Sequence, residues 1–173
     1  HMDDVLNSGI DSLKIEGRMK TALYVATVAR TYRKALDDLE KGREVYEQNL
    51  PWYEQQITGC TYRRFTTGFF YGKPDENSQI YDSNTYEKDY VYLGIAGQPD
   101  AAGVFDLEQR NKFSVGETIE IMKPDGRNIE VTVEHIQDLE GNEQESAPHA
   151  KQALKVKLSS APEAMDILRR KDF

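Results

Sequence analysis

Glu16, Arg18 and Lys20 are the charged side chains of the first part of the chain whose placement could do chemistry. Glu16 lies near the end of residues 12–17, a segment that is predicted to form a short strand, and Arg18 and Lys20 follow directly after it. In a β/α barrel the catalytic groups gather at the carboxyl ends of the strands, which is where these three residues would lie. A solvated charged loop before a helix explains the same pattern, although Gly17 between charged neighbours indicates a constrained backbone.

Cys60 is the single cysteine, so the chain cannot form an internal disulfide or supply a four-cysteine metal site by itself. Cys60 with His135 or His149 could form a thiol nucleophile and its base. However, His135 falls in a strand pattern and His149 in a turn, so a buried thiol and surface histidines are the simpler interpretation. The motifs of zinc proteases, serine hydrolases and phosphate-binding loops are absent from the sequence.

Basic and aromatic residues alternate in the segment after Cys60. They are Tyr62, Arg63, Arg64, Phe65, Phe69, Phe70, Tyr71 and Lys73. Such a mixture could stack nucleobases and neutralise phosphates. The alternative is that the aromatic rings fill the core of a small barrel. A second basic run, Arg169, Arg170 and Lys171, is interpreted as a solvated tail.

The composition describes an acidic globular protein of 173 residues with a formal net charge of -8. Residues 62–173 hold 14 basic and 20 acidic residues, which weakens the case that this part binds nucleic acid alone. No apolar run approaches the roughly 18 residues of a membrane span, and no secretion signal is present. We expect a cytoplasmic protein. His1 and Met2 match a remnant of tag removal, so His1 is excluded from any chemistry.

The first sixty residues show helical signals around one short strand. Residues 4–9 read as a helix end closed by Gly9, and residues 12–17 as a strand. An apolar stripe at three- and four-residue spacing predicts a helix over residues 21–41, stopped by Gly42. Pro51 suits the first turn of another helix over residues 51–61, with Trp52 in its packed face.

Residues 62–173 show strand signals instead. Residues 90–96 and 102–107 flank a Gly-Gln-Pro-Asp turn, and residues 118–122 and 129–134 flank a Pro-Asp-Gly-Arg turn that indicates a hairpin. Residues 154–158 alternate equally clearly, whereas residues 73–89 read as a connecting loop. Five or six short strands favour a small closed β-barrel over a sandwich.

The lone strand at residues 12–17 leaves both of its backbone edges unpaired, which suggests that its neighbours lie elsewhere. We therefore predict a C-terminal piece of a larger protein. Residues 1–61 would be a strand, two helices and a linker left from an upstream β/α barrel, and residues 62–173 an autonomous, mainly β domain.

Several motifs resemble peptidase family U32. The string Gly-Ile-Asp-Ser-Leu-Lys-Ile-Glu-Gly-Arg-Met-Lys at residues 9–20, followed by residues 24–28 and 32–33, carries the first part of the likeness. Residues 64–69, Arg-Phe-Thr-Thr-Gly-Phe, carry the second, and residues 113–117 and 147–149 carry the third. The resemblance spans nearly the whole chain.

The resemblance implies a β/α barrel with the active centre, a cysteine-ligated iron–sulfur cluster in several members, and a C-terminal barrel similar to those of translation factors. The cysteine-rich segment would lie upstream of residue 3, so no cofactor or metal is expected on this chain, which we expect to be inactive alone. Only Glu16 and Arg18 map onto the rim of the catalytic domain. Some members are described as collagenase-like proteases and others resemble hydroxylases of transfer or ribosomal RNA.

We therefore predict a non-catalytic accessory domain that binds a macromolecular substrate beside its own upstream catalytic domain, in a parent resembling an RNA hydroxylase. The candidate substrate-binding residues are Arg63, Arg64, Phe65 and Lys73. One alternative is the C-terminal domain of a protease acting on collagen-like or unfolded protein. Another is a purely structural module that stabilises the catalytic barrel. We expect no membrane partner.

Overall fold

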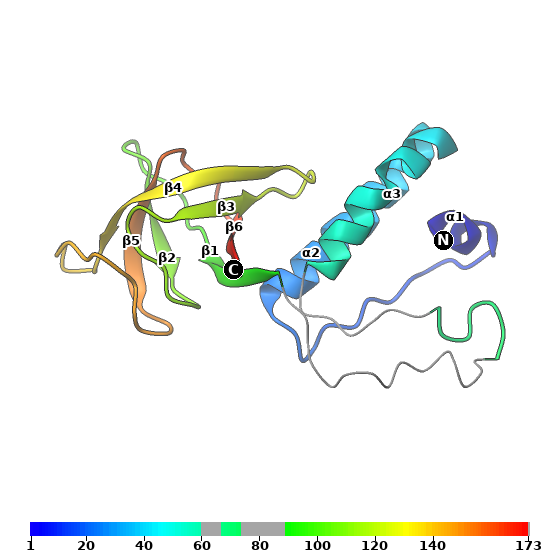
Figure 1. Ribbon diagram of the computed structural model, residues 1–173, viewed down its shortest axis with the longest axis horizontal. Coiled ribbons are helices and arrows are strands. Elements are labelled where there is room, and N and C mark those ends of the chain that lie inside the picture. The colour runs from blue at the N-terminus through cyan, green and yellow to red at the C-terminus, as the bar shows by residue number, and fades with distance from the viewer. Residues whose placement is uncertain (60–66, 74–88, 173) are drawn as a thin grey trace.

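The computed structural model describes residues 1–59, 67–73 and 89–172. Three helices come first: α1 (Met2–Asn7), α2 (Ala22–Lys41) and α3 (Arg43–Thr58). Six strands follow: β1 (Tyr90–Ile95), β2 (Val104–Glu108), β3 (Thr118–Met122), β4 (Asn128–Gln137), β5 (Ala153–Leu158) and β6 (Ile167–Lys171). Figure 1 shows the helices on one side of the molecule and the sheet on the other.

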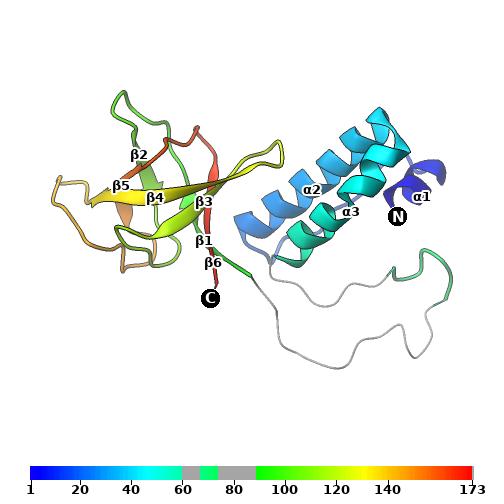
Figure 2. The ribbon, with the colours of Figure 1, turned by 45° about the horizontal axis from the view of Figure 1, so that its top comes forward.

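Helices α2 and α3 form an antiparallel hairpin, visible in Figure 2. Thr21 caps α2 by accepting a hydrogen bond from the Tyr24 N–H at 3.2 Å, and Gly42 ends the helix as predicted. Tyr46 and Tyr53 of α3 are buried against Ala35 of α2, and Trp52 packs partly buried against the same cluster. The predicted helix over residues 21–41 and the packed position of Trp52 are confirmed.

The predicted start of the second helix at Pro51 is wrong, because α3 begins eight residues earlier at Arg43. Gly42 both ends α2 and precedes α3, so the two helices are joined without a loop. Pro51 lies inside α3 with an exposed side chain. Proline removes one backbone hydrogen bond inside a helix, and the packing of Tyr46 and Tyr53 on either side of it outweighs that loss.

The predicted strand at residues 12–17 is not formed. The segment is extended but pairs with no strand among the described residues, and Leu13 and Ile15 are 48% and 45% exposed. A strand needs a neighbour to accept and donate its backbone hydrogen bonds, and the part of the chain that the structure describes offers none here. The fold class is therefore a six-stranded sheet preceded by three helices.

The sheet is antiparallel in the order β1-β6-β3-β4-β5-β2. The predicted strands of the alternating segments all form, with ends within a few residues of the prediction. The hairpin at Pro124-Asp125-Gly126-Arg127 joins β3 to β4, closed by a 2.9 Å hydrogen bond from the Lys123 N–H to the Arg127 carbonyl. Gly126 adopts a φ of 98°, which glycine permits.

Strand β6 corrects the interpretation of Arg169, Arg170 and Lys171 as a solvated tail. All three residues pair with β1, and Arg169 also pairs with Glu120 of β3. Arg169 is only 1% exposed. Its Nε donates to Glu120 at 2.9 Å, and its guanidinium lies 3.7 Å from the centre of the Tyr90 ring. The sequence Ile-Leu-Arg-Arg-Lys of β6 lacks the alternation of apolar and polar residues that predicts a strand. Arg169 occupies a buried position where an apolar side chain would be expected, and it pairs there with Glu120.

The predicted closure into a barrel is wrong, although the mainly β class is correct. Strands β1 and β2 stand at the two ends of the strand order, and among the described residues only an isolated bridge between Ala96 and Leu107 links them. A bulge between Tyr92 and Gly94 bends β1 and interrupts its register. Gly94 of β1 lies so close to Leu107 of β2 that a β-carbon at Gly94 would come within 2.5 Å of the Leu107 side chain. The two end strands therefore approach each other, but they do not form a continuous ladder of backbone hydrogen bonds.

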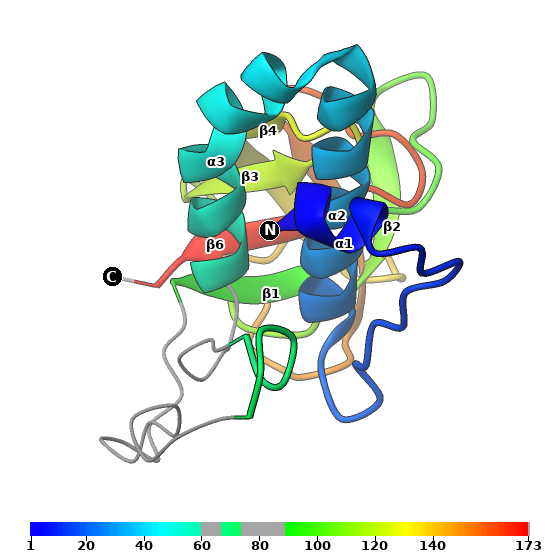
Figure 3. The same cartoon turned by 90° about the vertical axis from the view of Figure 1, so that its right-hand side faces the viewer.

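The sheet has an inner apolar core contributed by all six strands and a second apolar layer outside one half of it. The inner core lies within the curved sheet and includes Leu93, Phe105 and Ile136, each no more than 2% exposed. On the outer side, Leu23 of α2 packs against Met122 and Ile167 of β3 and β6. Figure 3 shows the helical hairpin in front of these strands. Helix α2 therefore covers the outer face of the β1-β6-β3 half.

Candidate functional site

The charged turn at Glu16 and Arg18 is exposed to solvent. A Glu16 carboxylate oxygen accepts a 2.9 Å hydrogen bond from the Arg18 N–H, and the other oxygen lies 3.5 Å from the Lys14 ammonium. A β-carbon on Gly17 would come within 2.7 Å of Val25, so the backbone approaches α2 closely at this point. The structure brings Glu16 and Arg18 together, and their position on an active-site rim stays a prediction.

The aromatic residues of the basic and aromatic segment are exposed where the structure describes them. Arg63, Arg64 and Phe65 lie outside the described residues. Phe69, Phe70 and Tyr71 are 78%, 44% and 56% exposed, and Lys73 is exposed beside them. The alternative that these three rings fill the core of the sheet is therefore wrong.

Helix α1 anchors this segment. The Tyr71 hydroxyl donates a hydrogen bond to the Asp4 carboxylate, and that bond raises the pKa of Tyr71 to about 12. Phe70 packs edge-to-face on Tyr71 with ring centres 4.9 Å apart. Figure 1 shows residues 67–73 beside α1, away from the sheet. The exposed rings are thus presented on the helical side of the molecule.

The thiol–imidazole hypothesis gains no geometric support. Cys60 lies outside the described residues, His135 is exposed 3.7 Å from Glu143, and His149 is exposed in the connection between β4 and β5. Within residues 1–59, 67–73 and 89–172, no group of three or more histidine, cysteine or acidic side chains could hold a metal ion. A four-cysteine iron–sulfur cluster does not fit the one cysteine of this chain.

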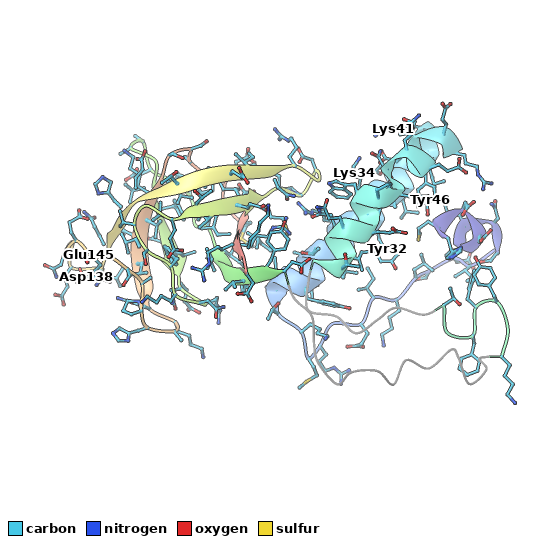
Figure 4. All side chains as sticks on the ribbon, in the orientation of Figure 1. Tyr32, Lys34, Lys41, Tyr46, Asp138 and Glu145 are labelled. Atoms are coloured by element: carbon cyan, nitrogen blue, oxygen red, sulfur yellow. The ribbon has the colours of Figure 1, made fainter. Side chains whose placement is uncertain are left out.

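The basic side chains on the outer face of β2, β5 and β4 are paired with acids. Lys155 lies 3.8 Å from Asp106, and Lys157 lies 3.4 Å from Glu134. Figure 4 shows Asp138 and Glu145 at the end of the molecule opposite the helical hairpin. Because phosphate binding needs clustered, uncompensated lysines and arginines, this face is poorly suited to it.

Arg30 joins the helical hairpin to the sheet. Its Nη1 donates to the Lys123 carbonyl at 3.0 Å and to the Asn128 side chain at 2.9 Å, and its Nη2 donates to the Gln56 side chain. Arg30 is 6% exposed. Sequence reasoning missed it, although Arg30 stands three residues after Thr27 on the buried side of α2. Of the predicted stripe, Val25 and Tyr32 are instead 41% and 38% exposed.

Asp38 is a second buried charge that sequence reasoning missed. It accepts hydrogen bonds from Lys34, Lys41, Asn49 and Tyr53, all within 3.0 Å. Burial alone would raise the pKa of Asp38, but the hydrogen bonds outweigh it and hold that pKa well below its usual range. Figure 4 shows Lys34 and Lys41 along the hairpin that this cluster ties together.

A groove of about 480 Å³ runs between α2 and the end of β3, next to Arg30. Ala26, Ala29, Met122 and Ile167 give it an apolar lining, and Lys123 lies at its edge, 2.7 Å from Asp166. The groove and the Arg30 contacts together define the junction between helices and sheet.

Among the described residues no helix is both long and apolar enough to cross a bilayer.

Two family models divide the chain between them. The model of peptidase family U32 matches residues 1–80, and that of the peptidase family U32 C-terminal domain matches residues 88–169. The chain belongs to peptidase family U32. The family that the motifs of residues 9–20, 64–69 and 113–117 resemble is therefore confirmed.

Curated relatives of this U32 chain carry two kinds of name. It is 35% identical to tRNA hydroxylation protein P1 of Bacillus subtilis, over 96% of this chain and 39% of that protein. It is 32% identical to tRNA hydroxylation protein P of Escherichia coli, over 86% of this chain and 32% of that protein. A collagenase of Porphyromonas gingivalis is 29% identical over 78% of this chain and 38% of that protein. The chain thus spans less than two fifths of each.

A solved structure is similar to part of this chain. The C-terminal domain of a Geobacillus thermoleovorans protein described as a U32 peptidase is 29% identical, covering 47% of this chain and 92% of that chain, with a TM-score of 0.42.

Proposed function

We propose that this chain is the accessory, substrate-positioning part of a U32 protein that modifies RNA. The observation that carries the proposal is the match to a tRNA hydroxylation protein over 96% of the chain. That match includes both the helices and the sheet, so the two parts belong to one functional unit. In this proposal the chain is inactive by itself, and its upstream catalytic domain is the partner.

The proposed division places residues 1–61 with the catalytic domain and residues 62–173 in the accessory domain. The two family models, which match residues 1–80 and 88–169, support a two-part organisation, but they place the change of part after residue 80 and not at the proposed boundary after residue 61. The exposed turn with Glu16 and Arg18 would then face the upstream active site, because the family resemblance maps these two residues onto the rim of the catalytic domain. The cytoplasmic location stays a prediction from composition.

We assign RNA contact to the basic and aromatic segment rather than to the sheet. The lysines on the outer face of the sheet are compensated by acids, whereas Phe69 and Phe70 are exposed and Lys73 lies next to them. Exposed aromatic rings stack nucleobases, and neighbouring cations neutralise phosphates. Arg63, Arg64 and Phe65 belong to the same proposed contact on the strength of their sequence.

The test replaces Arg63, Arg64 and Lys73 together by glutamine in the full-length protein. The logarithm of RNA affinity falls linearly with the logarithm of salt concentration, by about 0.7 per phosphate contact for a single strand. We expect tRNA affinity to drop at least tenfold and this slope to fall by about 2 in the triple variant.

The matched control replaces Arg127, Lys155 and Lys157, three cations paired with acids, by glutamine. It removes the same charge and is expected to leave affinity within twofold. Equal slopes in the wild-type protein and the Arg63/Arg64/Lys73 variant would contradict the proposal.

The collagenase relative supports a second candidate, in which the full protein cleaves collagen-like or unfolded protein. Incubating gelatin with the purified chain and with the full-length protein distinguishes proteolysis from RNA modification. Cleavage that disappears in a Cys60→Ser variant would favour proteolysis. A purely structural role predicts instead that deleting residues 62–173 unfolds the full-length protein without altering a specific binding step.

A further inference from the structure

We propose that Arg30 is a positioning residue that fixes the angle between the helical hairpin and the sheet, and thereby the place of bound RNA relative to the active centre. The inference about substrate placement rests on the proposed function. Its structural half, the fixed angle, rests on the contacts of Arg30 alone.

The guanidinium of Arg30 contacts three elements at once. Nη1 reaches the Lys123 carbonyl at the end of β3, the Arg127 carbonyl at 3.4 Å and the Asn128 side chain at the start of β4. Nη2 reaches Gln56 of α3. A planar fork with several donors in fixed directions defines an orientation, which a single-point contact does not. Arg30 thus ties α2, α3 and the β3–β4 hairpin into one geometry.

Apart from Arg30, the Asp89 N–H donates a 3.3 Å hydrogen bond to the Gly59 carbonyl, which joins the end of α3 to the start of β1. The other contacts of α2 with the sheet are less directional. Leu23 packs on Met122 and Ile167, and the Thr27 hydroxyl lies 3.5 Å from the Met122 sulfur. Such apolar packing holds the two parts together but depends mainly on buried area rather than on angle. A helix lined by small and apolar residues can slide on this face, so the directional bonds of Arg30 select one position.

All hydrogen-bond acceptors of Arg30 in the described part of the chain are neutral oxygens. The Trp52 ring adds a cation–π contact with its centre 5.6 Å away. Burial and the charge of Arg169 lower the pKa of Arg30 to about 10, so it stays charged at neutral pH. A buried cation is costly, and proteins keep one where several oriented acceptors hold it.

The structural test uses this chain and an Arg30→Met variant, which keeps bulk and burial but removes the fork. Residual dipolar couplings of backbone N–H groups measure the angle between helices and sheet. We expect the two parts of Arg30→Met to fit different alignment tensors, while wild type fits one.

The control is Arg33→Met, because Arg33 lies on the same helix beside the groove and is exposed, and among the described residues its guanidinium bonds to Asp37 of the same helix. It should reproduce the wild-type couplings. If Arg30→Met does not fold, Arg30→Lys carries the test, since it keeps the charge and loses the fork. A single tensor in every folded Arg30 variant would overturn the proposal.

The functional test uses the full-length protein. Arg30→Met is expected to bind tRNA within twofold of wild type while the maximal rate of hydroxylation falls at least tenfold, and Arg33→Met should change neither. Equal rates for the two variants would overturn the role in substrate placement. If the wild-type protein binds no tRNA, the proposed function fails, and the couplings still decide whether Arg30 fixes the angle.

Discussion

Single buried charges decide how the helices of this protein are held. Asp38 illustrates this, because its side chain is 1% exposed and accepts from two lysines, an asparagine and a tyrosine. Removing one partner of a buried, hydrogen-bonded cluster leaves the others unsatisfied, which costs more than an exposed ion pair. The stability of the helical hairpin therefore depends on a few buried charged residues.

We predict that Asp38→Asn destabilises the chain by about 3 kcal/mol, because Lys34 and Lys41 lose their shared anion. Urea titration followed by circular dichroism measures the loss. Asp37→Asn is the control, since Asp37 pairs with exposed Arg33, and should cost less than about 1 kcal/mol. A loss for Asp38→Asn as small as that of the control would contradict the cluster.

The same residue predicts a pH dependence. The pKa of Asp38 is lowered in the folded protein, so its stabilisation is complete above the unfolded value of about 4 and is lost as pH falls toward the folded value. Wild type should therefore lose more stability than Asp38→Asn when pH drops from about 5 to about 3. Parallel losses in thermal unfolding across that range would show that Asp38 has an ordinary pKa.

Sequence reasoning missed these residues for a physical reason. An arginine or aspartate within a helical pattern reads as solvent-facing, because burial of a charge requires partners from distant segments. The partners of Arg30 lie at residues 56 and 123–128. Only the tertiary structure brings them together. The weak signal available was the placement of Arg30 in line with Leu23 and Thr27, whose side chains α2 buries.

At the scale of elements, local chemistry defined the hairpins and helix ends. Thr21, Gly42 and the Pro-Asp-Gly-Arg turn have conformational preferences strong enough to be read directly. Strand β6 could not be read, because Arg169 occupies a buried position that pairs with Glu120. Whether the sheet closes into a barrel depends on how closely Gly94 of β1 approaches Leu107 of β2. Because these residues are distant in the sequence, no local sequence pattern predicts that approach.

The β3–β4 turn offers a test of its contact with the helices. A β-carbon on Gly126 would lie 3.0 Å from Lys34 and 3.3 Å from Trp52, whereas one on Gly141 meets nothing within 4 Å. Both glycines have positive φ, so alanine strains both backbones similarly. We expect Gly126→Ala to lower stability by about 1 kcal/mol more than Gly141→Ala. Equal melting temperatures would mean that the turn does not press on the helices.

The buried ion pair of β6 offers a second test at this scale. Glu120→Gln leaves Arg169 buried without its anion and should cost about 3 kcal/mol in chemical unfolding. Glu117→Gln is the matched change on the half-exposed pair with Arg170, and should cost less than about 1 kcal/mol. Similar costs for the two variants would place Arg169 in a wetter environment than the structure shows.

At the scale of the whole molecule, the paired charges of the sheet and the exposed aromatic rings lie at different ends. The outer sheet face carries compensated charges, and the acidic β4–β5 connection lies at the far end from the helices. The exposed aromatic rings and the Glu16–Arg18 turn lie on the helical side. An RNA bound by this chain is therefore expected to approach from that side, which also leads toward the proposed catalytic domain.

Photo-cross-linking of the full-length protein to tRNA containing 4-thiouridine tests this placement most directly, with the linked peptides identified by mass spectrometry. Binding of RNA through the basic and aromatic segment predicts cross-links within residues 60–73, reduced at least fivefold by Phe69→Ala, and none on strands β2 and β5. Cross-links concentrated on the outer face of the sheet, or none anywhere on residues 1–173, would contradict it.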